Sequence, residues 1–124
     1  MQRISLTDKL ASFAEQWSPK IVAELNGQHV KVVKLCGDFV WHHHQDEDEL
    51  FMVLAGKLHL DLRDPEAGER TVTLGPGELC VVPRGVEHRP RASEEAHVML
   101  VEPASTLNTG NVRDARTVDR PGWI

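Results

Sequence analysis

Short apolar runs separated by turn residues make up the chain between residues 20 and 102. Within these runs Val, Ile, Leu and Thr alternate with polar residues, which is typical of strands with one buried face. We expect strands at 21–25, 29–36, 39–44, 49–55, 58–63, 70–74, 78–83, 88–91 and 97–102. No helical pattern lies between them, so the sequence predicts an all-β sandwich or barrel. The expected interior positions are Val40, Phe51, Val53, Leu58, Leu60, Val81 and Leu100.

The two ends of the chain differ from this middle region. Apolar residues recur at helical spacing over 5–17, with Ser5 or Thr7 as the cap, and Pro19 ends the predicted helix. The polar residues 103–124 predict an irregular C-terminal tail, in which 108–111 either covers the barrel mouth or forms a surface turn. We therefore expect one domain over 1–124, with a barrel core at about 20–102.

Composition and charge narrow the possible partners. The 124 residues include 14 basic and 19 acidic side chains, and this net charge of −5 disfavours general nucleic-acid binding. No apolar run is long enough to span a bilayer, and the N-terminus has no apolar region of the signal-peptide kind. We expect a cytoplasmic protein in which Cys36 and Cys80 are free thiols.

Histidine and carboxylate residues form the main candidate for chemistry. On an extended segment, His42 and His44 share one face about 6.6 Å apart, whereas His43 points the other way. Glu49 follows a polar loop and begins the next strand, so its carboxylate can join the same face. His88 begins a later strand. Three imidazoles and one carboxylate suit Mn, Fe, Co, Ni, Cu or Zn better than Ca or Mg.

Two motifs occur in order around these residues. The first contains Gly37, His42, His44, Glu49 and Gly56, and the second contains Gly77, Pro83, Gly85 and His88. With this spacing, the chain resembles the small single-domain cupins, including those labelled mannose-6-phosphate isomerase-like. The resemblance implies a jelly-roll β-barrel with one divalent transition metal per chain, held by His42, His44, Glu49 and His88. It also implies a small-molecule ligand, with dioxygenase, isomerase, lyase and decarboxylase activities all represented in the family.

Two further sets of residues suggest interactions. Arg84 and Arg89 lie near His88 and could bind an anionic substrate, although exposed loop charge is the alternative. The face opposite the ligands is apolar and predicts a homodimer, unless the N-terminal helix covers it; its residues are Trp41, His43, Leu50, Met52 and Leu54. The sequence thus favours a metal-dependent enzyme acting on a small polar or anionic molecule. The alternative is a non-catalytic protein that binds or senses a sugar or carboxylate.

Overall fold

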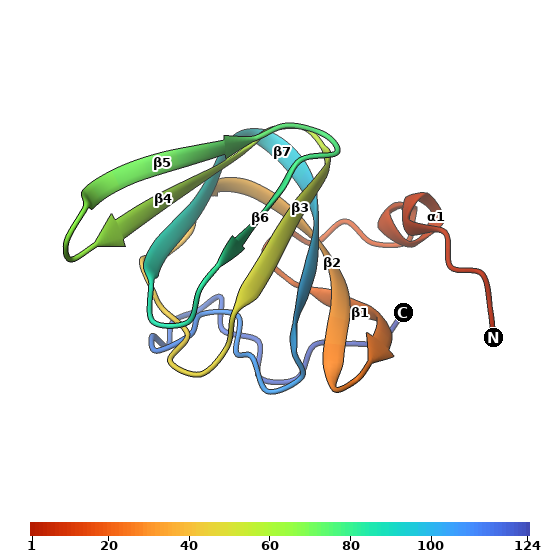
Figure 1. Ribbon diagram of the computed structural model, residues 1–124. Helices are drawn as coiled ribbons and strands as arrows, with labels where there is room; N and C mark the ends of the chain where they lie inside the picture. Colours follow the sequence, from red (N-terminus) through yellow and green to blue (C-terminus); the bar gives the residue numbers. More distant parts are fainter.

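The computed structural model describes residues 1–124 as a bent antiparallel sheet with one short helix outside it (Figure 1). In chain order the elements are α1 (Leu6–Ala11), β1 (Lys20–Leu25), β2 (Gln28–Asp38), β3 (Glu49–Ala55), β4 (Leu58–Asp64), β5 (Gly68–Leu74), β6 (Leu79–Val82) and β7 (Glu87–Pro103). The expected all-β class with a jelly-roll barrel is confirmed. The six-residue α1 is too short to cross a membrane, and no other helix is present.

Strand β7 organises the sheet, because it pairs with β2, β3 and β4. The strand order is β1-β2-β7-β3-β6, and β4 pairs with both β5 and β7. Two separate strands were expected at 88–91 and 97–102, and this prediction is wrong. Residues 93–95 are exposed, but they continue the strand. Strand β2 pairs with β7 on both sides of them, because a register shift between Leu35 and Gly37 of β2 accommodates the extra residues.

The core lies between the inward faces of the bent sheet. Thirteen buried residues form it, and they include the predicted Phe51, Val53, Leu58, Leu60 and Leu100. Two predicted interior residues do not belong to this cluster. Val40 is half-buried outside it, and Val81 is 52% exposed, because Val82 is the residue of β6 that points inward.

Helix α1 is shorter than the predicted 5–17. The side chain of Ser5 accepts a hydrogen bond from Asp8 N–H, as expected of the cap, but the helix ends at Ala11. Farther along, Trp17 takes a left-handed backbone with φ of 59°, and its N–H donates to Lys34 O. The helical spacing therefore does not continue to Trp17, because the chain turns there to place the indole against the barrel.

The C-terminal tail is irregular, as expected, and it crosses one end of the barrel (Figure 1). At its end, Ile21 N–H donates to Gly122 O, and Ile124 N–H donates to Ile21 O. Thr109 is fully buried where the tail passes the barrel. The tail is thus fixed both at the barrel end and at the edge of β1.

Candidate metal centre

The segment from Phe39 to His44 positions two of the candidate ligands. A strand was expected there, but the only ladder contact is an isolated bridge between His42 and His88. In that bridge each backbone N–H donates to the carbonyl of the other residue, at 3.0 and 2.8 Å. The segment is extended nonetheless. His42 and His44 therefore point inward and are buried, whereas His43 is half-buried on the other side.

The structure brings His42, His44, Glu49 and His88 together. Glu49 is the first residue of β3 and His88 the second of β7, so the site draws on both strands and on the extended segment. One potential ligand atom from each of the four side chains lies within 4.8 Å of all the others. Glu49 Oε1 is 3.5 Å from His44 Nε2 and 3.3 Å from His88 Nε2. These four residues are all buried and could hold one metal ion.

Hydrogen bonds orient two of the imidazoles. His42 Nδ1 lies 2.9 Å from Val40 O, and His88 Nδ1 lies 2.9 Å from Val86 O. A carbonyl oxygen only accepts, so each Nδ1 carries the proton and each Nε2 keeps its lone pair. Burial lowers the pKa of His42 to about 4, with a contribution from neighbouring His88. At neutral pH the ring is uncharged, which is the ligating form.

Several buried polar atoms of the cluster have no hydrogen-bond partner. They are Nδ1 and Nε2 of His44, Nε2 of His88 and Oε1 of Glu49. Burying such groups without partners costs free energy, and most buried polar atoms in folded proteins are paired. A transition metal would satisfy these nitrogen and oxygen donors together. The residues present therefore fit the metal that the sequence motifs imply.

A second carboxyl group lies beside Glu49. Burial would raise the pKa of Glu49, but its contacts with Glu102, His44 and His88 outweigh burial and hold that pKa well below its ordinary value. Burial and the adjacent Glu49 instead raise the pKa of Glu102 well above its ordinary value, although Lys31 opposes this. Of the two carboxyl groups, Glu49 is thus the one that its surroundings favour in the negatively charged form.

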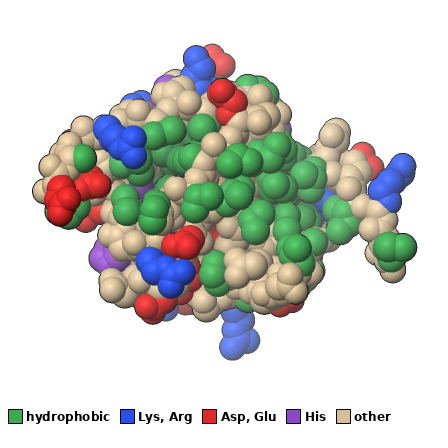
Figure 2. Space-filling model, viewed as in Figure 1, with side chains coloured by type: hydrophobic (Ala, Val, Ile, Leu, Met, Phe, Trp, Pro, Cys, Tyr) green, Lys and Arg blue, Asp and Glu red, His purple; other side chains and the backbone are tan.

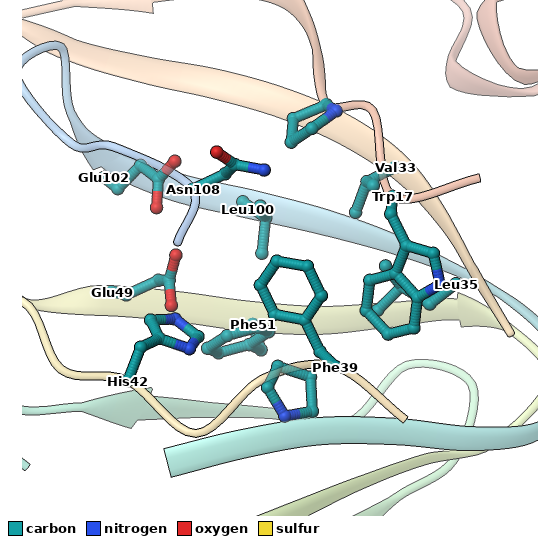
Figure 3. A pocket seen from close by; sticks show the side chains of 12 residues that line it. Trp17, Val33, Leu35, Phe39, His42, Glu49, Phe51, Leu100, Glu102 and Asn108 are labelled. Atoms are coloured by element: carbon teal, nitrogen blue, oxygen red, sulfur yellow. The ribbon is translucent and has the colours of Figure 1, made fainter. Parts of the chain in front are cut away.

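A pocket opens beside the cluster (Figure 3). About 40 Å³ of it admits the centre of a water-sized sphere, within about 410 Å³ of unoccupied space that includes solvent at the mouth. His42, Glu49, Glu102 and Asn108 form its polar end, while aromatic and aliphatic side chains form the rest. Trp17 and Phe39 stack with their ring centres 4.7 Å apart and an angle of 11° between the planes. A ligand would therefore meet acidic and imidazole groups at one end and a flat apolar wall at the other.

The tail closes part of the pocket. Asn108 lines it, and its amide group donates to Arg116 O and accepts from Val118 N–H. Asn111 N–H donates to His43 O, and Asn111 Oδ1 accepts from His43 N–H. Of the two alternatives for 108–111, the structure therefore favours the cover over the barrel mouth.

The two candidate arginines lie outside the lining of the pocket. Arg84 is paired with Asp48, and its side chain is 62% exposed. Arg89 is paired with Asp61 on the outer side of β4 and β7, together with Arg91. A role for Arg84 or Arg89 in binding substrate stays a prediction.

Sequence reasoning missed several residues around the site. Trp17 was assigned to a helix, and Phe39 was assigned to the metal-binding strand without a role of its own. Lys31 and Glu102 were read only as parts of strands. A charged residue at an inward position of an alternating strand is a usable signal, because such residues are rarely buried unless paired. Lys31 alternates with Val33 and Leu35 in this way.

The comparison with known families supports the assignment that these motifs suggested. A cupin domain model matches residues 29–102, which include all four candidate ligands and most of the barrel. The chain belongs to the cupin family.

Two similar proteins show how this cupin relates to others. The uncharacterized protein YdbB of Bacillus subtilis is 38% identical over 81 residues, which cover 65% of this chain and 68% of YdbB. A cupin-2 domain protein of Shewanella frigidimarina is 45% identical, with a TM-score of 0.75 over 81% of this chain and 93% of its own.

Larger enzymes contain the same cupin fold. The hydroquinone 1,2-dioxygenase of Sphingomonas sp. TTNP3, solved with 4-nitrophenol, matches with a TM-score of 0.73 and 20% identity. The match covers 84% of this chain and 33% of the dioxygenase chain. A second hydroquinone 1,2-dioxygenase structure, in complex with Fe3+, matches equally well. At this identity the likeness shows a shared fold.

Proposed function

We propose that this cupin is a metal-dependent enzyme that acts on a small molecule bound in the barrel. The observation that carries the proposal is the buried cluster of His42, His44, Glu49 and His88, which contains unpartnered nitrogen and oxygen atoms. Two of its members, His42 and Glu49, line a pocket. A metal bound there would polarise an oxygen of the ligand or take part in oxygen chemistry. The distantly related Fe3+-bound hydroquinone 1,2-dioxygenase supports this class of chemistry.

The lining of the pocket favours a particular shape of ligand. His42, Glu49 and Glu102 lie at one end, so oxygen donors of the ligand belong there. Trp17 and Phe39 form a flat wall at the other end, which suits a planar or apolar body. We therefore propose a small polar molecule that carries its oxygen atoms on one side. If it is anionic, the charge belongs at the metal, because the rest of the pocket wall is largely apolar and carries no cationic side chain.

The side chains of the chain itself have separate tasks in this proposal. The carbonyls of Val40 and Val86 keep His42 and His88 in the tautomer whose Nε2 faces the centre. The Trp17–Phe39 stack forms part of the pocket wall and the tail covers part of the pocket, so both would restrict the entry of water. Exclusion of water strengthens electrostatic interactions between the site and its ligand.

Metal analysis tests the proposal directly. Purified wild-type protein should contain up to one transition-metal ion per chain, and the His42→Ala/His88→Ala variant should contain almost none. A thermal-shift screen of the metal-loaded protein with phenols, hydroxy acids, sugars and sugar phosphates then identifies the ligand class. Equal metal contents in the two proteins would refute the site. A ligand that binds but is never converted would make the chain a binding or sensor protein.

We also propose a homodimer, formed through the outward face of β3 and β6. Leu50 lies opposite Val81 in the sheet, and Met52 lies opposite Leu79. Leu79 and Val81 are more than half exposed, and Figure 2 shows a broad hydrophobic area on this face. A patch of this kind on a small protein commonly marks an association surface.

Three residues of the predicted dimer face are in contact with other parts of the same chain. Leu54 packs against the Leu10 cluster at α1, as the alternative reading of this face anticipated. The ring of Trp41 is covered by the guanidinium groups of Arg63 and Arg89, and His43 is held by the tail. The proposed interface therefore centres on β6. Light scattering should give about twice the 13.9 kDa chain mass, and Val81→Lys should halve it.

Residues 1–124 are proposed to form one domain in the cytoplasm. Leu10 of α1 packs against Val22 and Val32, and the tail pairs with Ile21, so both ends lie on the barrel. The free thiols of Cys36 and Cys80 support a reducing compartment. Limited proteolysis should yield one resistant fragment that contains both the helix and the barrel.

A further inference from the structure

A cluster of charged side chains lies on the outer side of the barrel, where β4, β5 and β7 run next to one another (Figure 1). Asp61 of β4 lies opposite Thr71 of β5 and opposite Arg89 of β7, so these three side chains meet on one face of the sheet. His88 precedes Arg89 in β7 and points the other way, into the candidate metal centre. The cluster and the metal centre are therefore on opposite sides of the sheet.

One carboxylate holds two guanidinium groups in this cluster. Asp61 is only 7% exposed, and its Oδ2 accepts from Nε and Nη2 of Arg89 at 3.1 and 2.9 Å. The same oxygen accepts from Nε of Arg91 at 2.9 Å, while Oδ1 accepts from the Thr71 hydroxyl at 2.7 Å. Two positive charges thus share one negative oxygen, and each guanidinium group is fixed on its Nε side.

The other side of each guanidinium group has donors to spare. Nη1 and Nη2 of Arg91 donate to no residue of the chain, and Nη1 of Arg89 is 3.9 Å from Asp38 Oδ2, beyond hydrogen-bond distance. A planar guanidinium group presents the Nη1–Nη2 edge as a pair of N–H donors, a geometry that matches two oxygen atoms of one carboxylate or phosphate. Asp61 therefore leaves two such edges pre-oriented at the surface.

These side chains border a hollow in the surface. About 270 Å³ of it admits the centre of a water-sized sphere, and most of its lining residues are polar. Arg70, Arg89 and Arg91 supply three positive charges to the lining, against two carboxylates, those of Asp61 and Glu69. The hollow thus carries an excess of positive charge in a chain whose net charge is −5.

Ion pairing within the chain does not account for this excess. The guanidinium group of Arg70 has no hydrogen-bond or ion-pair partner, and Glu69 accepts instead from Arg63 at 3.0 Å. Bringing a third arginine beside Arg89 and Arg91 adds repulsion between like charges. An anion in the hollow would relieve this repulsion and use the free donors.

We propose that the hollow binds an oxyanion, the phosphate or carboxylate group of a small molecule. The Nη1–Nη2 edges of Arg89 and Arg91 donate to its oxygen atoms, and Arg70 adds the third positive charge. Asp61 orients the two guanidinium groups without contacting the anion. This site goes beyond the proposed function and does not depend on the metal centre.

Trp41 provides a spectroscopic probe in the hollow, because it lines it and its ring centre is 5.2 Å from Arg89 Cζ. The full-length, isotope-labelled protein is titrated with sodium phosphate and, separately, with sodium succinate at constant ionic strength, and followed by NMR. The indole N–H signal of Trp41, assigned with Trp41→Phe, should shift together with the Nε–H signals of Arg89 and Arg91. The indole signal of Trp17, in the barrel pocket, should not shift. The anion that binds more tightly identifies the group that the site prefers.

Three variants test whether the arginines cause the binding. Arg70→Gln removes one positive charge without breaking a hydrogen bond within the chain. Arg91→Lys keeps the charge but loses the planar pair of donors. Arg113→Gln is the matched control, because Arg113 is an exposed arginine of the tail, paired with Asp119. Melting temperatures establish that each variant is folded.

Arg70→Gln and Arg91→Lys should each weaken anion binding about tenfold, since charge-assisted hydrogen bonds are among the strong ones. Arg113→Gln should bind within about twofold of wild type, because salt screens distant charges. If neither anion shifted the Trp41 signal at millimolar concentrations, or if only the Trp17 signal moved, the inference would be overturned. Unchanged affinity in both arginine variants, or an equal loss in Arg113→Gln, would also overturn it, because general charge attraction would then be the cause.

Discussion

Gly110 is the point at which the C-terminal tail meets the ligand segment most closely, so replacing it tests the tail as a cover. A Cβ atom at this position would lie 2.2 Å from His43 O and 3.0 Å from His42 Cδ2. Favourable contacts between heavy atoms begin at about 3.5 Å. The nearest obstacle is backbone and cannot rotate away. In Gly110→Ala the tail must therefore retreat from His43 by about 1 Å.

The expected cost follows from the contacts that this retreat breaks. The two hydrogen bonds between Asn111 and His43, at 3.1 and 2.9 Å, are lost, at about 1 kcal/mol each. The left-handed backbone of Gly110, with φ of 55°, costs an alanine about 1 kcal/mol more. Gly110→Ala should thus lower the free energy of unfolding by about 3 kcal/mol, or by the whole docking energy of the tail if that is smaller.

Gly68→Ala is the matched control. Gly68 also has a positive φ, of 80°, but a Cβ there would meet nothing within 4 Å. This variant should lose only the backbone term of about 1 kcal/mol. Urea denaturation, monitored by far-ultraviolet circular dichroism, compares the free energies of unfolding of the two variants. Trypsin should also cleave the tail of Gly110→Ala faster, at Arg113 or Arg116. If Gly110→Ala were no less stable and no more easily cleaved than Gly68→Ala, the tail would not be seated on His43.

Three further predictions concern charge, packing and metal. Hydrogen bonds from Arg91, Thr71 and Arg89 outweigh burial and lower the pKa of Asp61 from 3.8 to about 2, so its carboxylate stabilises the folded state above pH 4 and this contribution is lost as pH falls toward 2. Asp61→Asn should therefore lower the free energy of unfolding by about 2 kcal/mol at pH 7. Urea titrations should show that the difference from wild type narrows below pH 4, and a difference that stays constant with pH would refute the pairing. Leu60→Ala removes a fully buried side chain and should cost about 3 kcal/mol in the same assay, with a loss below about 1 kcal/mol contradicting its place in the core. Free Co2+ at a hundred times its Kd should raise the free energy of unfolding by about 2.7 kcal/mol, and His88→Ala should abolish most of that gain; an equal gain in the variant would exclude His88 as a ligand.

The parts of the site that the sequence predicted are those encoded by local spacing. His42 and His44 share a face because successive residues of an extended chain alternate, and this holds although no regular strand forms there. Glu49 was predicted because a polar loop joins it to His44, so both lie on neighbouring extended segments. His88 was assigned from the second motif, and the structure brings it to the other three.

The parts that were not predicted depend on register and on long-range packing. Lys31 and Glu102 are 71 positions apart, and only the pairing of β2 with β7 places them in contact. The apolar spacing that suggested a helix through Trp17 did not reveal that Trp17 lies at the pocket wall, where it stacks on Phe39. Neither relation follows from the residues next to it in the chain.

The position of β7 in both the chain and the sheet has a consequence for the order of folding. Before residue 87 is available, the chain can form the local hairpins β1–β2 and β4–β5, but the strand that joins β2, β3 and β4 is missing. Three of the four candidate ligands are already present at that stage. The fourth, His88, arrives with the strand that closes the barrel. Closure of the barrel therefore also completes the candidate metal centre, so tight metal binding during refolding should report a finished barrel.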